Sequence, residues 1–236
     1  MKRFLSLTTL SYLLVAVAFI NVKESSAADQ SAVLTIDFEE MNLGTNPGGF
    51  SVSKTGDGSD SIWTVEDRVT GTQKSKVLIQ SSADSIRSRF PLCVYQEFSA
   101  RNLDISVNFL PLTGSIDQAG GIVWRYQDEN NYYVVRANAL EDNVVLYKME
   151  NGIRSDLKPI GAGVSSYGEE VFVPVGQWST LKVVVNDDRF AVSLNNDHLF
   201  DVQDETFQGI GKVGLWTKAD SVTAFDNLLI RSTDSK

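Results

Sequence analysis

The chain has 236 residues, of which 42% are hydrophobic and 22% charged, and its formal net charge at pH 7 is −9. An acidic chain with no basic run is a poor candidate for binding nucleic acid or an anionic lipid surface. Cys93 is the single cysteine, so no intrachain disulfide can form and a hydrophobic core must supply the stability. It lies in the apolar run 90–98, which favours a buried, unreactive thiol.

The first 28 residues have the layout of a secretory signal peptide. Lys2 and Arg3 precede an apolar run over 4–20, and small residues follow at 25–28. We expect cleavage after Ala27 or Ala28, export to a periplasm or the extracellular space, and no membrane attachment afterwards. The run is near the lower limit for a membrane span, so an uncleaved anchor is the alternative. Without residues 1–28 the chain has 18 basic and 29 acidic residues, a net charge of −11.

The rest of the chain, residues 29–236, predicts a single all-β domain. No helical period is sustained, and short runs of period two are separated by Gly, Asn, Asp and Pro. The predicted strands are 33–39, 61–67, 76–81, 88–96, 103–112, 121–127, 131–138, 144–149, 170–175, 180–186, 189–195, 198–204, 212–218 and 221–231. The strongest hairpin signal is Asn151-Gly152. So many strands without helices indicate two packed antiparallel sheets, a jelly-roll sandwich.

Polar and aromatic side chains alternate with core residues in the predicted strands from 121 to 218. If those strands are neighbours, period two places one set on a common face. The set is Arg125, Gln127, Tyr132, Arg136, Asn138, Lys148, Trp216 and Lys218. Such a face is typical of a carbohydrate-binding cleft, with Trp216 and Tyr132 stacking on sugar rings and the others hydrogen-bonding to hydroxyls. The alternative is a solvated outer face on which Arg stems cover apolar neighbours.

Three stretches resemble a known family. They are AGGIVWRYQDENNYYVVRANALEDNVVLYKMENG at 119–152, QWSTLKVVV at 177–185 and GIGKVGLWTKADSVTAFDNLLI at 209–230. They are similar to the secreted concanavalin A-like domains grouped with the 3-keto-disaccharide hydrolase family, and the resemblance covers 33–231. It implies a jelly-roll sandwich of the laminin G and β-glucanase kind. It also implies a link to glycans, in some members through cleavage of 3-keto-glycosides.

Glu141 and Asp142 are the candidate catalytic residues. A β-glucanase is disfavoured, because glycoside hydrolysis needs two carboxylates about 5–10 Å apart and no E-x-D-x-x-E pattern occurs. A 3-keto-glycoside is easier to cleave, since its ketone acidifies the adjacent C–H. Glu141 or Asp142 could remove that proton while Arg136 or Lys148 stabilises the enolate oxygen. Alternatively, both acids only shape a hairpin and pair with Arg or Lys.

The sequence also restricts the kinds of metal site that we expect, and it leaves a second function open. His198 is the only histidine, so neither a His-rich zinc site nor a Ser-His-Asp triad is expected. Glu39 and Asp226 could hold a structural calcium where the first and last strands meet, and no other cofactor is expected. The alternative function is a non-catalytic, laminin G-like adhesion or scaffold domain whose polar face binds a protein.

Overall fold

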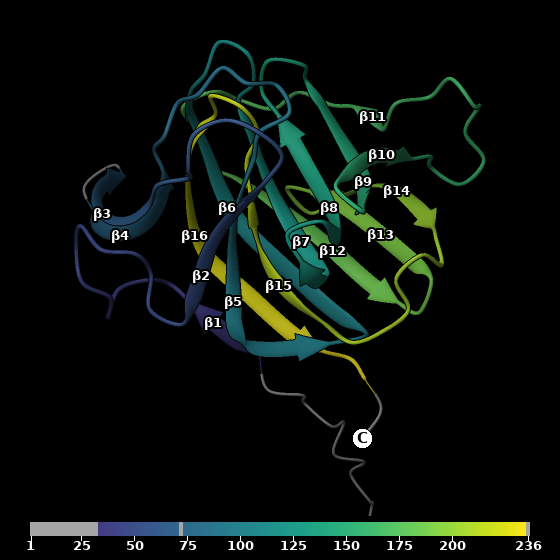
Figure 1. Cartoon of the computed structure of the whole chain (residues 1–236), viewed down its shortest axis with the longest axis horizontal. Coiled ribbons are helices and arrows are strands. Elements are labelled where there is room, and N and C mark those ends of the chain that lie inside the picture. Colours follow the sequence, from purple (N-terminus) through teal and green to yellow (C-terminus); the bar gives the residue numbers. More distant parts are fainter. Residues whose placement is uncertain (1–32, 71–72, 235–236) are drawn as a thin grey trace, which may run out of the picture. The chain divides into compact units, whose positions relative to one another are not determined.

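The computed structural model describes residues 33–70 and 73–234, which form sixteen β-strands and no helix (Figure 1). Accordingly, no helix in these ranges is long and apolar enough to span a membrane. The predicted signal peptide lies outside the described residues. The fold class predicted from the sequence, an all-β sandwich of two antiparallel sheets, is confirmed.

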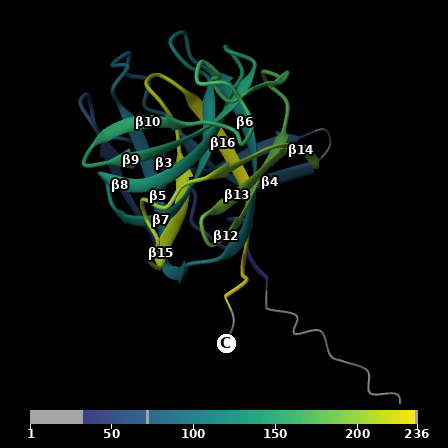
Figure 2. The ribbon, with the colours of Figure 1, turned by 90° about the vertical axis from the view of Figure 1, so that its right-hand side faces the viewer.

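All strand pairs in the two sheets are antiparallel. The first sheet has the order β14 (Asp197–Gln203), β13 (Arg189–Leu194), β12 (Ser179–Asn186), β6 (Leu103–Thr113), β16 (Val222–Ser232), β4 (Gln73–Gln80) and β3 (Trp63–Thr70), and β1 (Leu34–Ile36) also pairs with β16. The second has the order β10 (Ile153–Leu157), β9 (Asn143–Glu150), β8 (Asn131–Asn138), β7 (Ala119–Asp128), β15 (Gly211–Trp216), β5 (Phe90–Ala100) and β2 (Phe50–Thr55), and β11 (Glu169–Glu170) pairs with β9. Figure 2 shows β8, β9 and β10 in one layer and β12, β13 and β14 in the other.

The main core lies between the two sheets and is built from the inward side of each strand. Trp124 of β7 stacks on Tyr133 of β8 with 5.5 Å between ring centroids, and it meets Phe190 of β13 edge-on at 5.3 Å. Cys93 is buried in the same core, as expected, and burial raises the pKa of its thiol, which disfavours the reactive thiolate.

Most predicted strands are present, with two omissions and one error. The Asn151-Gly152 hairpin is confirmed, with φ of 50° and 77°. Strands β2 and β10 were not predicted. The strand predicted over 170–175 is wrong, because regular pairing in this segment is limited to Glu169–Glu170 and the chain then continues as a loop through Pro174.

The second sheet is curled so strongly that its outer face closes on itself. In a flat sheet β10 and β5 would lie about 24 Å apart, because neighbouring strands are about 4.8 Å apart. Instead, the guanidinium of Arg154 in β10 lies 4.9 Å from the ring centroid of Phe90 in β5. Similarly, Thr55 Oγ1 in β2 lies 2.8 Å from the hydroxyl of Tyr132 in β8, although three strands lie between β2 and β8 in the sheet order.

This curl creates a second hydrophobic core on the outer face. Its buried members are Phe90, Leu92, Val94, Ala119, Val123, Tyr132, Val134, Val145, Tyr147, Met149 and Trp216. Phe90 and Trp216 stack at 5.5 Å, and the guanidinium of Arg154 covers both Phe90 and Tyr147. The face that would be a groove in an open sheet is therefore filled by the protein's own side chains.

Candidate functional site

The open sugar-binding face predicted from the sequence is not formed. Trp216 and Tyr132, the two predicted stacking residues, are both 0% exposed in the second core. The ring of Trp216 lies against Phe90, and the hydroxyl of Tyr132 lies against Thr55. Neither ring can stack on a sugar in this conformation. The alternation was correct at these two positions, but the curl of the sheet buries the face to which they belong.

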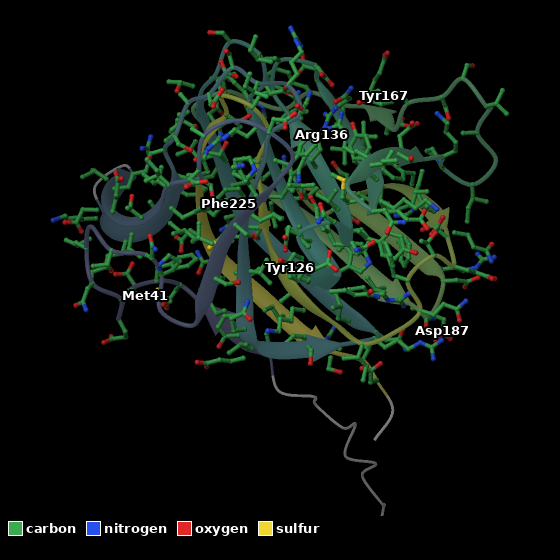
Figure 3. All side chains as sticks on the ribbon, in the orientation of Figure 1. Met41, Tyr126, Arg136, Tyr167, Asp187 and Phe225 are labelled. Atoms are coloured by element: carbon green, nitrogen blue, oxygen red, sulfur yellow. The ribbon has the colours of Figure 1, made fainter. Side chains whose placement is uncertain are left out.

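Arg125 lies at a different place from Arg136, so the prediction that they share a face is wrong. A register shift between Trp124 and Asp128, with a φ of 47° at Arg125, interrupts the alternation. The guanidinium donates to the main-chain carbonyls of Arg101, Asp187 and Phe207 and lies 5.6 Å from the ring centroid of Phe190. Asp187 and Arg136 are far apart in Figure 3. Arg125 thus joins loops at the other end of the sandwich.

Lys148 lies at the same end of the sandwich as Arg125, away from Arg136. Its ammonium donates to Thr206 Oγ1 at 2.6 Å and pairs with Glu150 at 3.3 Å and Asp204 at 3.7 Å. The hydroxyl of Tyr133 donates to Asp204 Oδ1 at 2.6 Å. These contacts hold the loop between β14 and β15, and they place Lys148 apart from the predicted catalytic acids.

Arg136 is buried at the centre of a polar cluster, which we call the Arg136 cluster (Arg136, Glu141, Asn143, Tyr147 and Tyr167). Its guanidinium donates to Glu141 Oε2 at 2.6 Å, to the hydroxyl of Tyr147 at 3.1 Å and to that of Tyr167 at 3.4 Å. It also donates to Asn143 Oδ1, and the two tyrosine hydroxyls bond to each other. Figure 3 shows Arg136 and Tyr167 close together. Tyr167 was not singled out from the sequence.

Asn138 and Lys218 both contact the carboxylate of Asp117, which is fully buried. Lys218 Nζ lies 2.7 Å from Asp117 Oδ2, and Asn138 Nδ2 donates to Asp117 Oδ1 at 2.7 Å. The positive charge of Lys218 also helps to lower the pKa of Glu141. Of the predicted set, the structure therefore groups Arg136, Asn138 and Lys218 with Glu141.

An open cavity of about 470 Å3 lies beside the Arg136 cluster. We call it the Glu141 pocket, and its lining is Glu141, Asp142, Glu170, Val171 and Phe172. Phe172 is 73% exposed, an unusual position for a phenylalanine, and Tyr167 nearby in the chain is 44% exposed. An exposed aromatic ring beside three carboxylates is a surface that a ligand with C–H groups and hydroxyl donors fits.

The two predicted catalytic acids have different surroundings. The carbonyl oxygen of Asp142 accepts the N–H of Val171 at 3.0 Å, and its Oδ1 accepts the N–H of Val173 at 2.9 Å. Asp142 therefore anchors the segment that carries Phe172. Partial burial would raise the pKa of Glu141, but the charge and hydrogen bond of Arg136 outweigh it and hold that pKa below its usual range. Glu141 is consequently ionised at neutral pH and a weak base.

Comparison with known proteins addresses the fold. No model of a protein family matches this sequence, and no curated protein matches it. The solved carbohydrate-binding module CBM66 from Bacillus subtilis is similar, with a TM-score of 0.58 and 20% identity over 78% of this chain and 96% of that one. The fold is a jelly roll.

Two further jelly-roll structures have similar scores. Domain 4 of AbnA, a GH43 extracellular arabinanase from Geobacillus stearothermophilus solved with arabinotriose, has a TM-score of 0.52 and 14% identity over 84% of this chain and 90% of that one. A protein of unknown function from Shewanella oneidensis has a TM-score of 0.52 and 12% identity over 86% and 89%. At these identities the likeness shows the fold alone. The resemblance to the 3-keto-disaccharide hydrolase family remains a prediction.

Glu39 and Asp226, the predicted calcium ligands, lie near the junction of β1 and β16. Burial, and then the charges of Glu39 and Asp37, raise the pKa of Asp226 to about 6. Glu39 Oε1 accepts the N–H of Lys76 at 2.9 Å. Among the described residues, no three His, Cys, Asp or Glu side chains are grouped to hold a metal ion. A structural calcium remains a prediction.

The raised pKa of Asp226 predicts a pH-dependent effect of Asp226→Asn. A carboxyl whose pKa is higher in the folded than in the unfolded protein makes the fold less stable as pH rises. For Asp226 this loss of unfolding free energy occurs between about pH 4 and about pH 6. We expect Asp226→Asn to raise the free energy of unfolding by about 1 kcal/mol at about pH 7.5, after allowing for partial solvent screening, and to change little at about pH 4. Urea unfolding at both pH values, with chelator and then with added calcium, measures this.

The same experiment separates the charge effect from calcium binding. If calcium binds between Glu39 and Asp226, the wild type gains stability on calcium addition and Asp226→Asn does not. A variant that is less stable than the wild type at neutral pH in chelator would show that the ionised form of Asp226 is favourable in the fold.

Proposed function

We propose that the mature chain is an exported carbohydrate-binding protein and that the Glu141 pocket holds the sugar. The observation that carries this proposal is the exposed ring of Phe172 in a cavity of about 470 Å3 that three carboxylates also line. A pyranose or furanose ring has an apolar C–H face that packs on an aromatic ring, and its hydroxyls donate to carboxylate oxygens. In this proposal Phe172 stacks, while Glu141 and Glu170 accept hydrogen bonds.

The architecture behind the pocket supports this role. Arg136 holds Glu141 at 2.6 Å and Asp142 holds the main chain of Val171 and Val173, so the pocket is preorganised before a ligand arrives. The fold provides further support. Two similar structures are a carbohydrate-binding module and a domain solved in complex with arabinotriose.

A hydrolase or lyase acting on 3-keto-glycosides is the second candidate. One observation favours it: the carboxylate of Glu141, which lines the pocket, lies 2.6 Å from the guanidinium of Arg136 buried behind it, and elimination beside a ketone needs such a base and such a donor. In that reaction Glu141 would take the proton next to the ketone and Arg136 would stabilise the enolate oxygen. The enolate would then expel the aglycone, which takes the proton from Glu141, and water would add to the resulting double bond. The lowered pKa of Glu141 weakens it as a base. Binding therefore ranks ahead of catalysis.

Ligand-observed NMR on the mature chain tests the proposal, with a panel of disaccharides and their 3-keto forms. We expect saturation transfer from at least one sugar and an affinity at least about tenfold lower in Phe172→Ala, because the stacking surface is lost. The matched control is Ile210→Ala, since Ile210 is 66% exposed and does not line the Glu141 pocket. It should bind like the wild type.

The outcomes separate the three functions. Transfer without new product signals supports a binding protein, whereas products formed only from keto-sugars, and lost in Glu141→Gln, support the enzyme. If no sugar gives transfer, or if Phe172→Ala and Ile210→Ala behave alike, the pocket is not the sugar site. A protein-binding, laminin G-like scaffold would then be the function to test.

A further inference from the structure

A second cavity, of about 300 Å3, lies between strand β5 and the segment that joins β1 to β2. We call it the Tyr95 pocket. It shares no lining residue with the Glu141 pocket. Met41, which lines it, is far from Arg136 in Figure 3. The two cavities are therefore separate sites on the domain.

The floor and one wall of the Tyr95 pocket are apolar. Ile36 and Phe38 are buried beneath it, and Met41 is half-buried at its side. The ring of Tyr95 forms the wall and is supported by Phe50, with 5.0 Å between centroids. A Cβ at Gly49 would lie 3.1 Å from the Tyr95 ring, and φ there is 78°, so glycine allows the chain to follow the ring closely.

The rim of the pocket carries a net negative charge. Three exposed carboxylates, those of Asp37, Glu40 and Glu97, line it, and no lysine, arginine or histidine does. Within the described parts of the chain none of the three forms a salt bridge. Lys76 brings one positive charge near the rim, since its ammonium donates to the main-chain carbonyls of Glu39 and Met41 at 2.6 and 2.8 Å, so the three carboxylates leave the rim negative overall.

The backbone beneath the pocket is held in an uncommon conformation. Phe38 has a φ of 61°, in the left-handed region that bulky side chains rarely adopt. The ring of Phe38 is buried against that of Phe50, with 6.2 Å between the ring centroids. Residues in such conformations are strained and gather at ligand sites. Phe38 also begins a turn beneath the cavity, in which its carbonyl accepts the N–H of Met41 at 3.0 Å.

We infer that the Tyr95 pocket binds a small organic cation, a protonated amine joined to an apolar body. The apolar floor accepts the body, the carboxylates of Asp37, Glu40 and Glu97 neutralise the ammonium, and the face of Tyr95 attracts the cation. An anion of the same shape is repelled by the rim, and a neutral molecule gains only the contacts with the floor. This site is independent of the sugar proposed for the Glu141 pocket.

Three probes of the same size and different charge test the inference: phenethylammonium, 2-phenylethanol and phenylacetate. The methyl group of Met41 is a suitable reporter, because the whole chain has only three methionines. In a ¹H–¹³C spectrum of the mature chain, we expect a saturable shift of this methyl with phenethylammonium, with a Kd on the order of 1 mM. The alcohol should bind at least about fivefold more weakly, and phenylacetate should cause no saturable shift.

The double variant Glu40→Gln/Glu97→Gln tests the carboxylates, with Glu170→Gln as a control exposed carboxylate from the other pocket. We expect phenethylammonium to bind at least about tenfold more weakly to the double variant and normally to the control. Equal shifts with all three probes, no saturable shift with phenethylammonium, or equal binding by both variants would overturn the inference. Since sugar binding is judged with Phe172→Ala, either proposal can fail without the other.

Discussion

Replacing Trp216 by alanine should cost about 4 kcal/mol of unfolding free energy, the range found when a buried tryptophan is truncated. The indole is fully buried against Phe90 on the outer face of the second sheet. Because the sheet curls over this face, water cannot fill the cavity that removal of the indole would leave. Urea unfolding followed by far-UV circular dichroism measures the change. This prediction tests the claim that the outer face is a second core.

Phe172→Ala is the matched control, because Phe172 is an exposed aromatic residue. It should change the unfolding free energy by no more than about 0.5 kcal/mol. We expect the two variants to affect different properties: Trp216→Ala loses stability, and Phe172→Ala loses sugar binding. If Trp216→Ala cost less than about 1 kcal/mol and also abolished sugar binding, the outer face would be an open groove after all.

The second large effect is expected at Arg89, which precedes Phe90 at the start of β5. Its buried guanidinium donates to the carbonyls of Ser59 at 2.8 Å, Asp60 at 3.0 Å and Ala219 at 2.8 Å, and also to Ser82. One side chain therefore joins three loops.

Arg89→Met should lower the unfolding free energy by about 4 kcal/mol, because several carbonyls lose a charged donor and remain partly buried. Arg89→Lys should recover only part of this loss, since an ammonium has three donors and no planar fork. Arg87→Met is the control from the same segment, since Arg87 is exposed. Thermal unfolding of all three variants makes the comparison. Equal losses at the two arginines would contradict the structural role given to Arg89.

The fold could be predicted from the sequence because it depends on local signals. Short runs of period two, separated by turn residues such as Asn151-Gly152, determine the strands, and the absence of a helical period excludes other classes. The error at 170–175 has a local cause as well. Phe172 lies in an apparent alternating run, but Pro174 and the hydrogen bonds to Asp142 shape the segment as a loop.

The candidate site was predicted only in part, because its geometry depends on long-range features. Glu141 and Arg136 were recognised and do form a pair. The bulge that displaces Arg125 and the curl that buries Trp216 arise from the pairing of whole strands, which alternation does not report. One signal was present: residues 132–137 and 144–147 are apolar or aromatic at nearly every position, a pattern typical of strands buried on both faces.

Binding of a sugar at the Glu141 pocket is the central claim, and a ¹H–¹⁵N titration of the mature chain with the best-binding sugar tests it most directly. We expect saturable shifts at the amides of Asp142, Val171 and Phe172, and no shift at the indole N–H of Trp216. A sugar that shifted the Trp216 indole signal and left the Phe172 amide unchanged would contradict binding at the Glu141 pocket, because it would place the ligand inside the second core.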